Sequence, residues 1–161
     1  MFQINDKVIH CREGLSIISK EVEINGKKYF LIYAVGGNGE SIYVPLETAT
    51  SIIRSIMSPA KADEVVDFMK TVKPEFITNT KQRRDAYKRR LGSGNVLDLA
   101  YLARQLFLFH YLNDHGTLVK LGPTDIEMLE YASKILYDEF ALSYNLPRNE
   151  IMEIIESRIE L

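Results

Sequence analysis

The feature that most constrains the fold is a change in hydrophobic spacing near Leu46. Before this residue the apolar side chains alternate or form short β-branched and aromatic runs, which is typical of strands. After it they recur at the three- and four-residue intervals of helices as far as the C-terminus. A chain of 161 residues has room for one ordinary domain or two small ones. The spacing therefore predicts an α+β protein, with a small, bent β-sheet or barrel module at residues 1–55 and an all-α helical domain at residues 56–161.

About four to five short strands are expected in the N-terminal part, separated by residues that favour turns. Gly14, the Asn25-Gly26 pair and the glycine-rich run at residues 36–39 provide these turns. A glycine-rich run can also cradle a phosphate, but such a loop must lead into a helix, and this one leads into a predicted strand. A hairpin turn is therefore the favoured interpretation. The expected strands lie in residues 8–9, 15–18, 28–33 and 42–45.

Capping residues divide the helical part into segments. Ser58-Pro59, Asn79 and Asn95 are each typical of a helix start, and a capping-box pattern begins at Pro123. The predicted helices are residues 47–57, 60–70, a basic helix that runs from Asn79 to Gly92, 96–113, 125–144 and 148–160. Their core is expected to contain Leu99, Ala103, Leu106, Leu129, Ile135 and Leu136.

The sequence KQRRDAYKRR at residues 81–90 concentrates positive charge in a protein whose formal net charge is −2. It carries six of the twenty Lys and Arg residues, and only Asp85 opposes them. From residue 125 onward nine acids face three bases, so the charge is unevenly distributed along the chain. A basic run on a helix can be a solvated face or a phosphate-binding surface, and both interpretations remain open. Helical spacing places Lys81, Arg84 and Lys88 on one stripe, Arg83 and Arg90 on a second, and leaves Ala86, Tyr87 and Leu91 to contact the bundle.

Other classes of protein find little support. No apolar run reaches the roughly 20 residues of a membrane span, and no signal peptide is expected. One cysteine, Cys11, cannot form an intramolecular disulfide, which fits a cytoplasmic protein. His10-Cys11, His110 and His115 have no partners at metal-ligand spacing, and no nucleophile motif is present. We therefore expect no metal, no cofactor and no enzymatic activity.

Seven short segments follow one another in a characteristic order. In the N-terminal part these are FQINDKVIH (residues 2–10), KYFL (28–31) and IYVPLETA (42–49). In the helical part they are LGSGN (91–95), ARQL (103–106), MLEYASKIL (128–136) and EFAL (139–142). In sequence and in order they resemble the CarD/CdnL family of bacterial transcription regulators, over nearly the whole chain.

The resemblance implies a two-part adaptor. The N-terminal module would be Tudor-like and would add a strand to the β subunit of RNA polymerase, while the helical domain would contact promoter DNA at the upstream edge of the transcription bubble and stabilise the open complex. The polymerase-binding residues would be Ser41, Ile42, Tyr43, Val44 and Leu46. The DNA-binding residues would be Thr80, Lys81, Arg83, Arg84, Lys88 and Arg90. The alternative is a polymerase-bound adaptor that makes no direct contact with DNA.

The chain departs from the family at two positions that bear on DNA. Where some members carry a basic residue near the start of the later long helix, this chain has Ile126 or its acidic neighbours. Many members have a tryptophan at the start of the basic helix, where it wedges against the minor groove. This chain contains no tryptophan, and Asn79-Thr80 occupies the corresponding place. We therefore expect polymerase binding together with an altered contact to promoter DNA at the nucleoid. Oligomeric state and the direction of regulation are left open.

Overall fold

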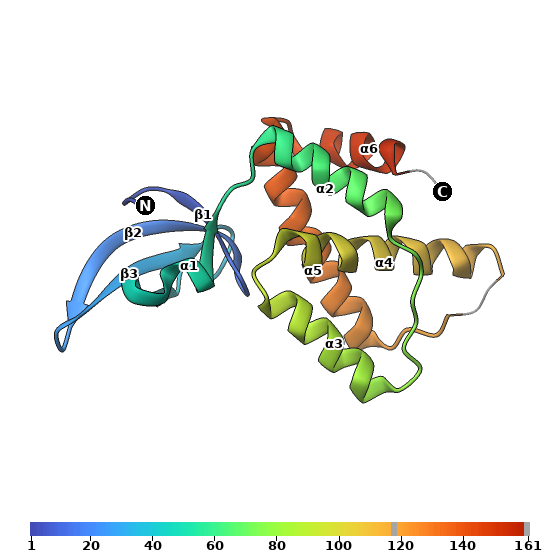
Figure 1. Ribbon diagram of the computed structural model, residues 1–161, viewed down its shortest axis with the longest axis horizontal. Coiled ribbons are helices and arrows are strands. Elements are labelled where there is room, and N and C mark those ends of the chain that lie inside the picture. The colour runs from blue at the N-terminus through green and yellow to red at the C-terminus, as the bar shows by residue number, and fades with distance from the viewer. Residues whose placement is uncertain (117–118, 160–161) are drawn as a thin grey trace. The chain divides into compact units, whose positions relative to one another are not determined.

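The computed structural model describes residues 1–116 and 119–159, and divides them into two compact units. The first unit is Met1–Ile56 and the second begins at Met57. The first contains a five-stranded antiparallel sheet and the second is helical, which confirms the α+β class (Figure 1).

The sheet is formed by β1 (Lys7–His10), β2 (Gly14–Ile24), β3 (Lys27–Ala34), β4 (Ser41–Pro45) and β5 (Ile53–Ser55). Their order across the sheet is β4-β3-β2-β1-β5, so β4 and β5 form its two edges. Asn25 and Gly26 both have positive φ, 50° and 76°, which is the backbone geometry of a tight hairpin turn between β2 and β3. The register shifts between Ile18 and Lys20, and a bulge of this kind bends a strand.

The helix expected at residues 47–57 is the one clear error in the predicted elements. The chain forms a 3₁₀ turn, η1 (Leu46–Thr48), and a single turn of α-helix, α1 (Ala49–Ile52), and then enters β5. Ile53 is buried and lies opposite His10 on β1. Pairing with β1 and burial in the sheet core therefore override the helical spacing of this short segment.

The core of the sheet unit follows the two-residue alternation of the strands. Phe30 and Ile32 on β3 are buried, and so is Val44 on β4, which lies opposite Phe30. The Phe2 ring packs edge-on against Phe30, with the ring centres 6.5 Å apart. The buried cluster comprises Val8, Ile18, Phe30, Ile32, Val44, Ala49 and Ile53.

The helical unit is formed by α2 (Pro59–Thr71), α3 (Thr80–Gly92), α4 (Val96–Asp114), α5 (Pro123–Tyr144) and α6 (Arg148–Arg158). The predicted starts of three of these helices are confirmed. The side chains of Ser58, Asn79 and Asn95 accept hydrogen bonds from backbone N–H groups in the first turns of α2, α3 and α4. These caps satisfy N–H groups that have no partner within the helix.

The predicted helical core is confirmed with one exception. Leu99, Ala103, Leu129, Ile135 and Leu136 are all buried. Leu106, by contrast, is only half-buried and lines a surface groove between α4, α5 and α6. Solvent reaches the Leu106 side chain through this groove. The expectation that Leu106 is fully buried is therefore wrong.

Candidate functional site

Strand β4 carries most of the residues expected to bind polymerase. It lies at one edge of the sheet and pairs only with β3, so the main-chain groups on its other side have no strand partner in the unit. Tyr43 is 54 % exposed, whereas Val44 is fully buried. Leu46 differs from the expectation because it lies in η1 rather than in the strand, where it packs against the sheet core. The unit therefore presents a short open edge with one prominent aromatic side chain.

An aromatic face lies beside this edge. Tyr43 is opposite Leu31 on β3, and its ring packs edge-on against Tyr29, with the ring centres 6.2 Å apart. Tyr33, two residues beyond Leu31, is 38 % exposed. Neither Tyr29 nor Tyr33 is among the site residues expected from the sequence, although alternation within β3 places both on the face of Tyr43.

A buried histidine stabilises the turn between β1 and β2. The Nδ1 atom of His10 accepts hydrogen bonds from the backbone N–H groups of Arg12 and Glu13, both at 3.1 Å. Burial lowers the pKa of His10, since the charged imidazolium is poorly solvated there. A neutral ring is also what these two bonds require, because a protonated Nδ1 cannot accept them.

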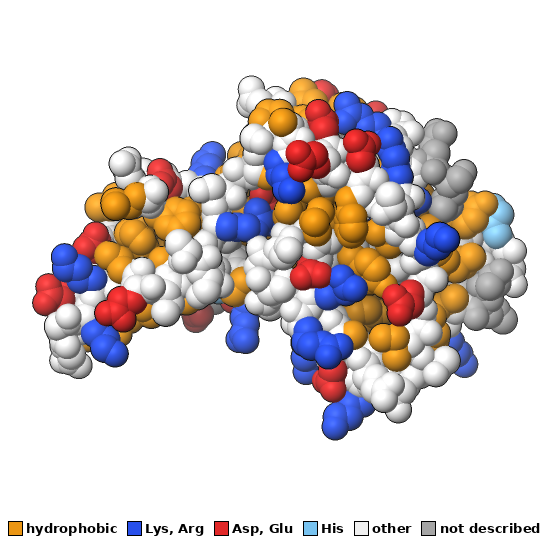
Figure 2. All heavy atoms as spheres, viewed as in Figure 1, with side chains coloured by type: hydrophobic (Ala, Val, Ile, Leu, Met, Phe, Trp, Pro, Cys, Tyr) orange, Lys and Arg blue, Asp and Glu red, His pale blue; other side chains and the backbone are white. Residues whose placement is uncertain are grey.

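Helix α3 carries the basic run. In Figure 2, basic side chains gather over this helix at the lower edge of the helical unit. Thr80, Lys81 and Lys88 are exposed, as a phosphate-binding surface requires. Arg84 is half-buried, and its Nε atom is buried without a hydrogen-bond partner. Half of the expected DNA-binding set is therefore exposed on one helix.

Arg83 is a correction to the expected set. Its side chain is 6 % exposed, and its guanidinium donates two hydrogen bonds to the carboxylate of Asp125, at 2.9 Å and 2.8 Å. It also donates to the carbonyl oxygen of Ile77. The hydrogen bonds from Arg83 hold the pKa of Asp125 below its ordinary value. Arg83 therefore joins α3 to the start of α5 and is not available to a phosphate.

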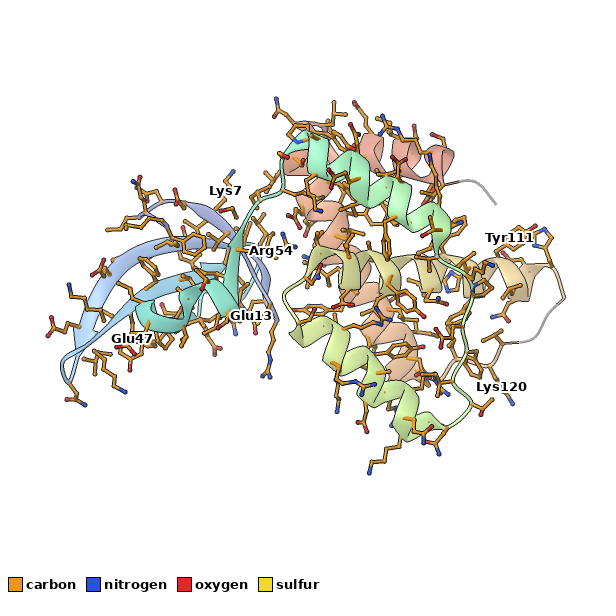
Figure 3. The ribbon with its side chains drawn as sticks, in the orientation of Figure 1. Lys7, Glu13, Glu47, Arg54, Tyr111 and Lys120 are labelled. Carbon is orange, nitrogen blue, oxygen red and sulfur yellow. The ribbon has the colours of Figure 1, made fainter. Side chains whose placement is uncertain are left out.

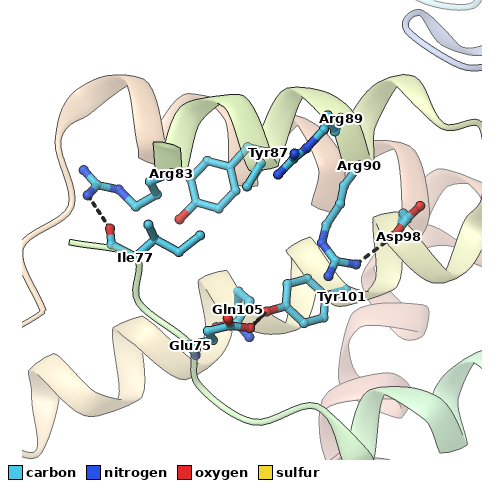
Figure 4. Close-up of a pocket in the computed structure, with 10 residues that line it drawn as sticks. Glu75, Ile77, Arg83, Tyr87, Arg89, Arg90, Asp98, Tyr101 and Gln105 are labelled. Carbon is cyan, nitrogen blue, oxygen red and sulfur yellow. Dashed lines mark hydrogen bonds and ion pairs between the residues drawn. The ribbon is translucent and has the colours of Figure 1, made fainter. Parts of the chain in front are cut away.

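Arg90 is also engaged within the protein. Its guanidinium forms an ion pair with Asp98 at 2.8 Å and lies over the ring of Tyr101, 3.7 Å from the ring centre (Figure 4). Its side chain is half-exposed, so it borders a pocket rather than the open face of α3. Neither member of the predicted second stripe is therefore a free surface cation. Position on a helix did not reveal this, because the partners come from α4 and α5.

The acids of the C-terminal helices separate into two groups. Asp125 and Glu139 are buried, and Glu139 accepts a hydrogen bond from the backbone N–H of Met57 at 2.9 Å. The others among the described residues of α5 and α6 are half-buried or exposed. The exposed acids are Glu127, Glu130, Glu150, Glu153 and Glu156. The uneven charge distribution seen in the sequence is thus largely a property of the surface.

The far end of α4 exposes another aromatic side chain. Tyr111 points away from the bundle (Figure 3) and stacks on His115, with the ring centres 3.9 Å apart.

Within residues 1–116 and 119–159, no group of three or more His, Cys, Asp and Glu side chains could hold a metal ion. No helix in the described part of the chain is both long enough and apolar enough to cross a membrane.

Comparison with known protein families identifies the helical unit. The family model for the CarD C-terminal domain matches residues 64–156, which is more than half of the chain. The match begins within α2 and ends within α6, so it includes α3, α4 and α5 in full. Members of this family are regulatory, transcription-related proteins. The chain therefore belongs to the CarD/CdnL family.

Proposed function

We propose that this protein binds the β subunit of RNA polymerase through its N-terminal sheet unit and contacts promoter DNA through its helical domain, and that it thereby modulates the stability of the open complex. The proposal rests chiefly on the family match of the helical unit combined with the open edge of β4. It places the protein in the cytoplasm, at the nucleoid, through its attachment to polymerase. It also treats the sheet unit as Tudor-like.

Strand addition is the mode of binding that suits β4. An open edge offers N–H and C=O groups at regular spacing, so a partner strand gains main-chain hydrogen bonds there. Side chains next to that edge then supply specificity, because alternate residues project to the same face. Tyr43, Tyr29 and Tyr33 are suited to this role, since tyrosine combines a large apolar surface with a polar hydroxyl group.

Replacing Tyr43 tests the polymerase contact. We expect Tyr43→Glu to weaken capture of a β-subunit fragment by about tenfold or more, because it puts a charge where an aromatic anchor packs. The residue is exposed, so the variant should fold normally. Tyr111→Glu is the matched control, since Tyr111 is an exposed tyrosine on the helical unit. Wild-type capture by a folded Tyr43→Glu variant would rule out β4 as the binding strand.

DNA contact is assigned to the exposed part of α3, namely Thr80, Lys81 and Lys88, with Arg84 beside them. A few phosphate contacts give weak binding, with a dissociation constant on the order of 10⁻⁴ to 10⁻⁶ M. Attachment to polymerase raises the effective concentration of the helix at the promoter, so weak contacts can still change the open complex.

Charge reversal tests the DNA contact. We expect Lys81→Glu/Lys88→Glu to shorten the lifetime of the open complex while capture of the β subunit stays unchanged. The slope of log affinity against log salt concentration should decrease by about 0.9 for each phosphate that is no longer neutralised. The control is Lys61→Glu/Lys70→Glu, which makes the same charge change on exposed residues of α2. Equal lifetimes in the two double variants would contradict direct DNA contact.

The adaptor without DNA contact is the second candidate. It is favoured by the pairing of Arg83 with Asp125 and of Arg90 with Asp98, which removes two of the cations expected to face DNA. It predicts that the α3 double variant keeps both the salt dependence and the open-complex lifetime of the wild type. The same experiment therefore separates the two functions.

A further inference from the structure

A pocket of about 400 Å³ lies between α3, the start of α4 and the segment that joins α2 to α3 (Figure 4). Its size falls within the range of small-molecule sites, roughly 300 to 1,000 Å³. Its lining combines aromatic and aliphatic side chains with several polar groups. The proposed polymerase and DNA contacts make no use of the pocket, which lies behind the exposed face of α3.

Tyr87 contributes an unpartnered hydroxyl group to this pocket. The residue is 6 % exposed, and its hydroxyl forms no hydrogen bond with any described residue. Figure 4 shows the ring extending from α3 into the space bordered by Ile77 and Gln105. Burial raises the pKa of Tyr87 to about 12, so the hydroxyl keeps its proton at neutral pH and can donate it. The hydroxyl oxygen is not among the buried side-chain atoms that lack a partner, so it is open to the pocket, where a ligand oxygen can accept its hydrogen bond.

The opposite wall is held in place by hydrogen bonds. Gln105 donates to the carbonyl oxygen of Lys73 at 2.6 Å and accepts from the backbone N–H of Glu75 at 3.1 Å. The Tyr101 hydroxyl donates to the carboxylate of Glu75 at 2.7 Å, and Arg90 covers the Tyr101 ring. These interactions tie the joining segment to α4, so the pocket is formed in advance and a ligand need not order it.

The lining contains three arginines and two acids, Glu75 and Asp98, and one of the arginines has no acidic partner among the described residues. Arg83 and Arg90 are paired with Asp125 and Asp98. Arg89 is exposed and, within the described parts of the chain, forms no ion pair or hydrogen bond. It therefore offers guanidinium N–H groups in a geometry that suits phosphate or carboxylate oxygens. Arg89 is not among the site residues expected from the sequence.

We propose that this pocket binds a small metabolite carrying a phosphate or carboxylate group, whose oxygens accept hydrogen bonds from the Tyr87 hydroxyl and the Arg89 guanidinium. The body of the ligand lies against Ile77 and Ala86, which supply the apolar part of the lining. The site is separate from the DNA contact assigned to Lys81 and Lys88, and the proposal does not depend on that contact.

Calorimetric titration of the full chain with AMP, citrate and inorganic phosphate tests the proposal. We expect at least one of these probes to bind. Tyr87→Phe and Arg89→Gln should each weaken its binding by about tenfold, because each removes one hydrogen-bond donor to an anion. Lys88→Gln is the matched control, since it removes the same charge from α3 outside the pocket. Tyr87→Phe should unfold at the wild-type temperature or above it, because the hydroxyl has no partner to lose.

Three results would overturn the proposal. The first is that none of the three probes binds the wild-type protein at millimolar concentration. The second is that a probe binds, but equally well to wild type, Tyr87→Phe and Arg89→Gln. The third is that Tyr87→Phe weakens binding of a DNA duplex as much as binding of the probe, since the pocket would then serve a DNA phosphate rather than a free metabolite.

Discussion

The two units differ in how well sequence periodicity identifies their inward-facing residues. In the sheet unit, the alternation along β3 and β4 places Phe30, Ile32 and Val44 in the core and Tyr43 outside it. In the helical unit, Arg83 is buried although it belongs to a basic run, and Leu106 is partly open although it belongs to an apolar one. Successive side chains of a strand point to opposite faces of the sheet, so each one faces either the core or the solvent. A helix within a bundle has neighbours on several sides, and their placement decides which stripe is covered.

Breaking the buried ion pair of α3 and α5 should have the largest effect. We expect Asp125→Ala to reduce the free energy of unfolding by about 3 to 5 kcal/mol, because it leaves the Arg83 guanidinium buried without its partner. Urea denaturation measures the loss. The double variant Arg83→Met/Asp125→Leu should recover much of it, since no unpaired charge remains. A loss as small as that of Lys88→Ala, about 0.5 kcal/mol or less, would mean that Arg83 is a surface residue after all.

Two leucines of the helical unit test whether burial, rather than spacing in the sequence, decides how much a side chain contributes to stability. Leu129 is fully buried, so Leu129→Ala should cost about 2 to 5 kcal/mol of unfolding free energy. Leu106 is half-buried, so Leu106→Ala should cost clearly less, because its side chain packs less fully and solvent reaches the site. The same urea experiment compares them. Equal losses would show that Leu106 belongs to the core, as its spacing in the sequence predicts.

His10 gives a smaller, pH-dependent effect in the sheet unit. The pKa of His10 is lower in the folded state than in the unfolded state, so the folded protein binds fewer protons than the unfolded chain. The stability it contributes is present above the unfolded-state pKa, near 6.5, and is lost as the pH falls through the lower folded-state value. The protection of the Arg12 and Glu13 amide groups, which is the ratio of the intrinsic to the observed rate of hydrogen exchange, should therefore decrease as the pH falls.

His10→Asn is the control for that measurement. An asparagine oxygen can accept the bonds from Arg12 and Glu13, but it does not titrate in this range. The loss of protection at acidic pH should be absent in this variant. The same loss of protection in both proteins would mean that another group titrates at the turn.

Most helices and strands could be predicted from the sequence, because their turns and caps depend on short-range interactions. The Asn25-Gly26 turn and the caps at Ser58, Asn79 and Asn95 depend on residues within a few positions of one another. β5 was missed because it exists only through pairing with β1, more than forty residues earlier in the chain. A three-residue strand has too short a pattern to be recognised without its partner.

The sequence alone determined the α+β class, the order of most elements, and the family resemblance that the match at residues 64–156 supports. The tertiary structure decided which charges are free. Arg83 and Arg90 look like Lys81 and Lys88 in the sequence, yet the first two meet Asp125 and Asp98 on other helices. It also decided that Tyr87 and Arg89 line one pocket with Glu75 and Gln105. Turns and caps depend on short-range interactions, whereas the environment of a side chain depends on residues that only folding brings near.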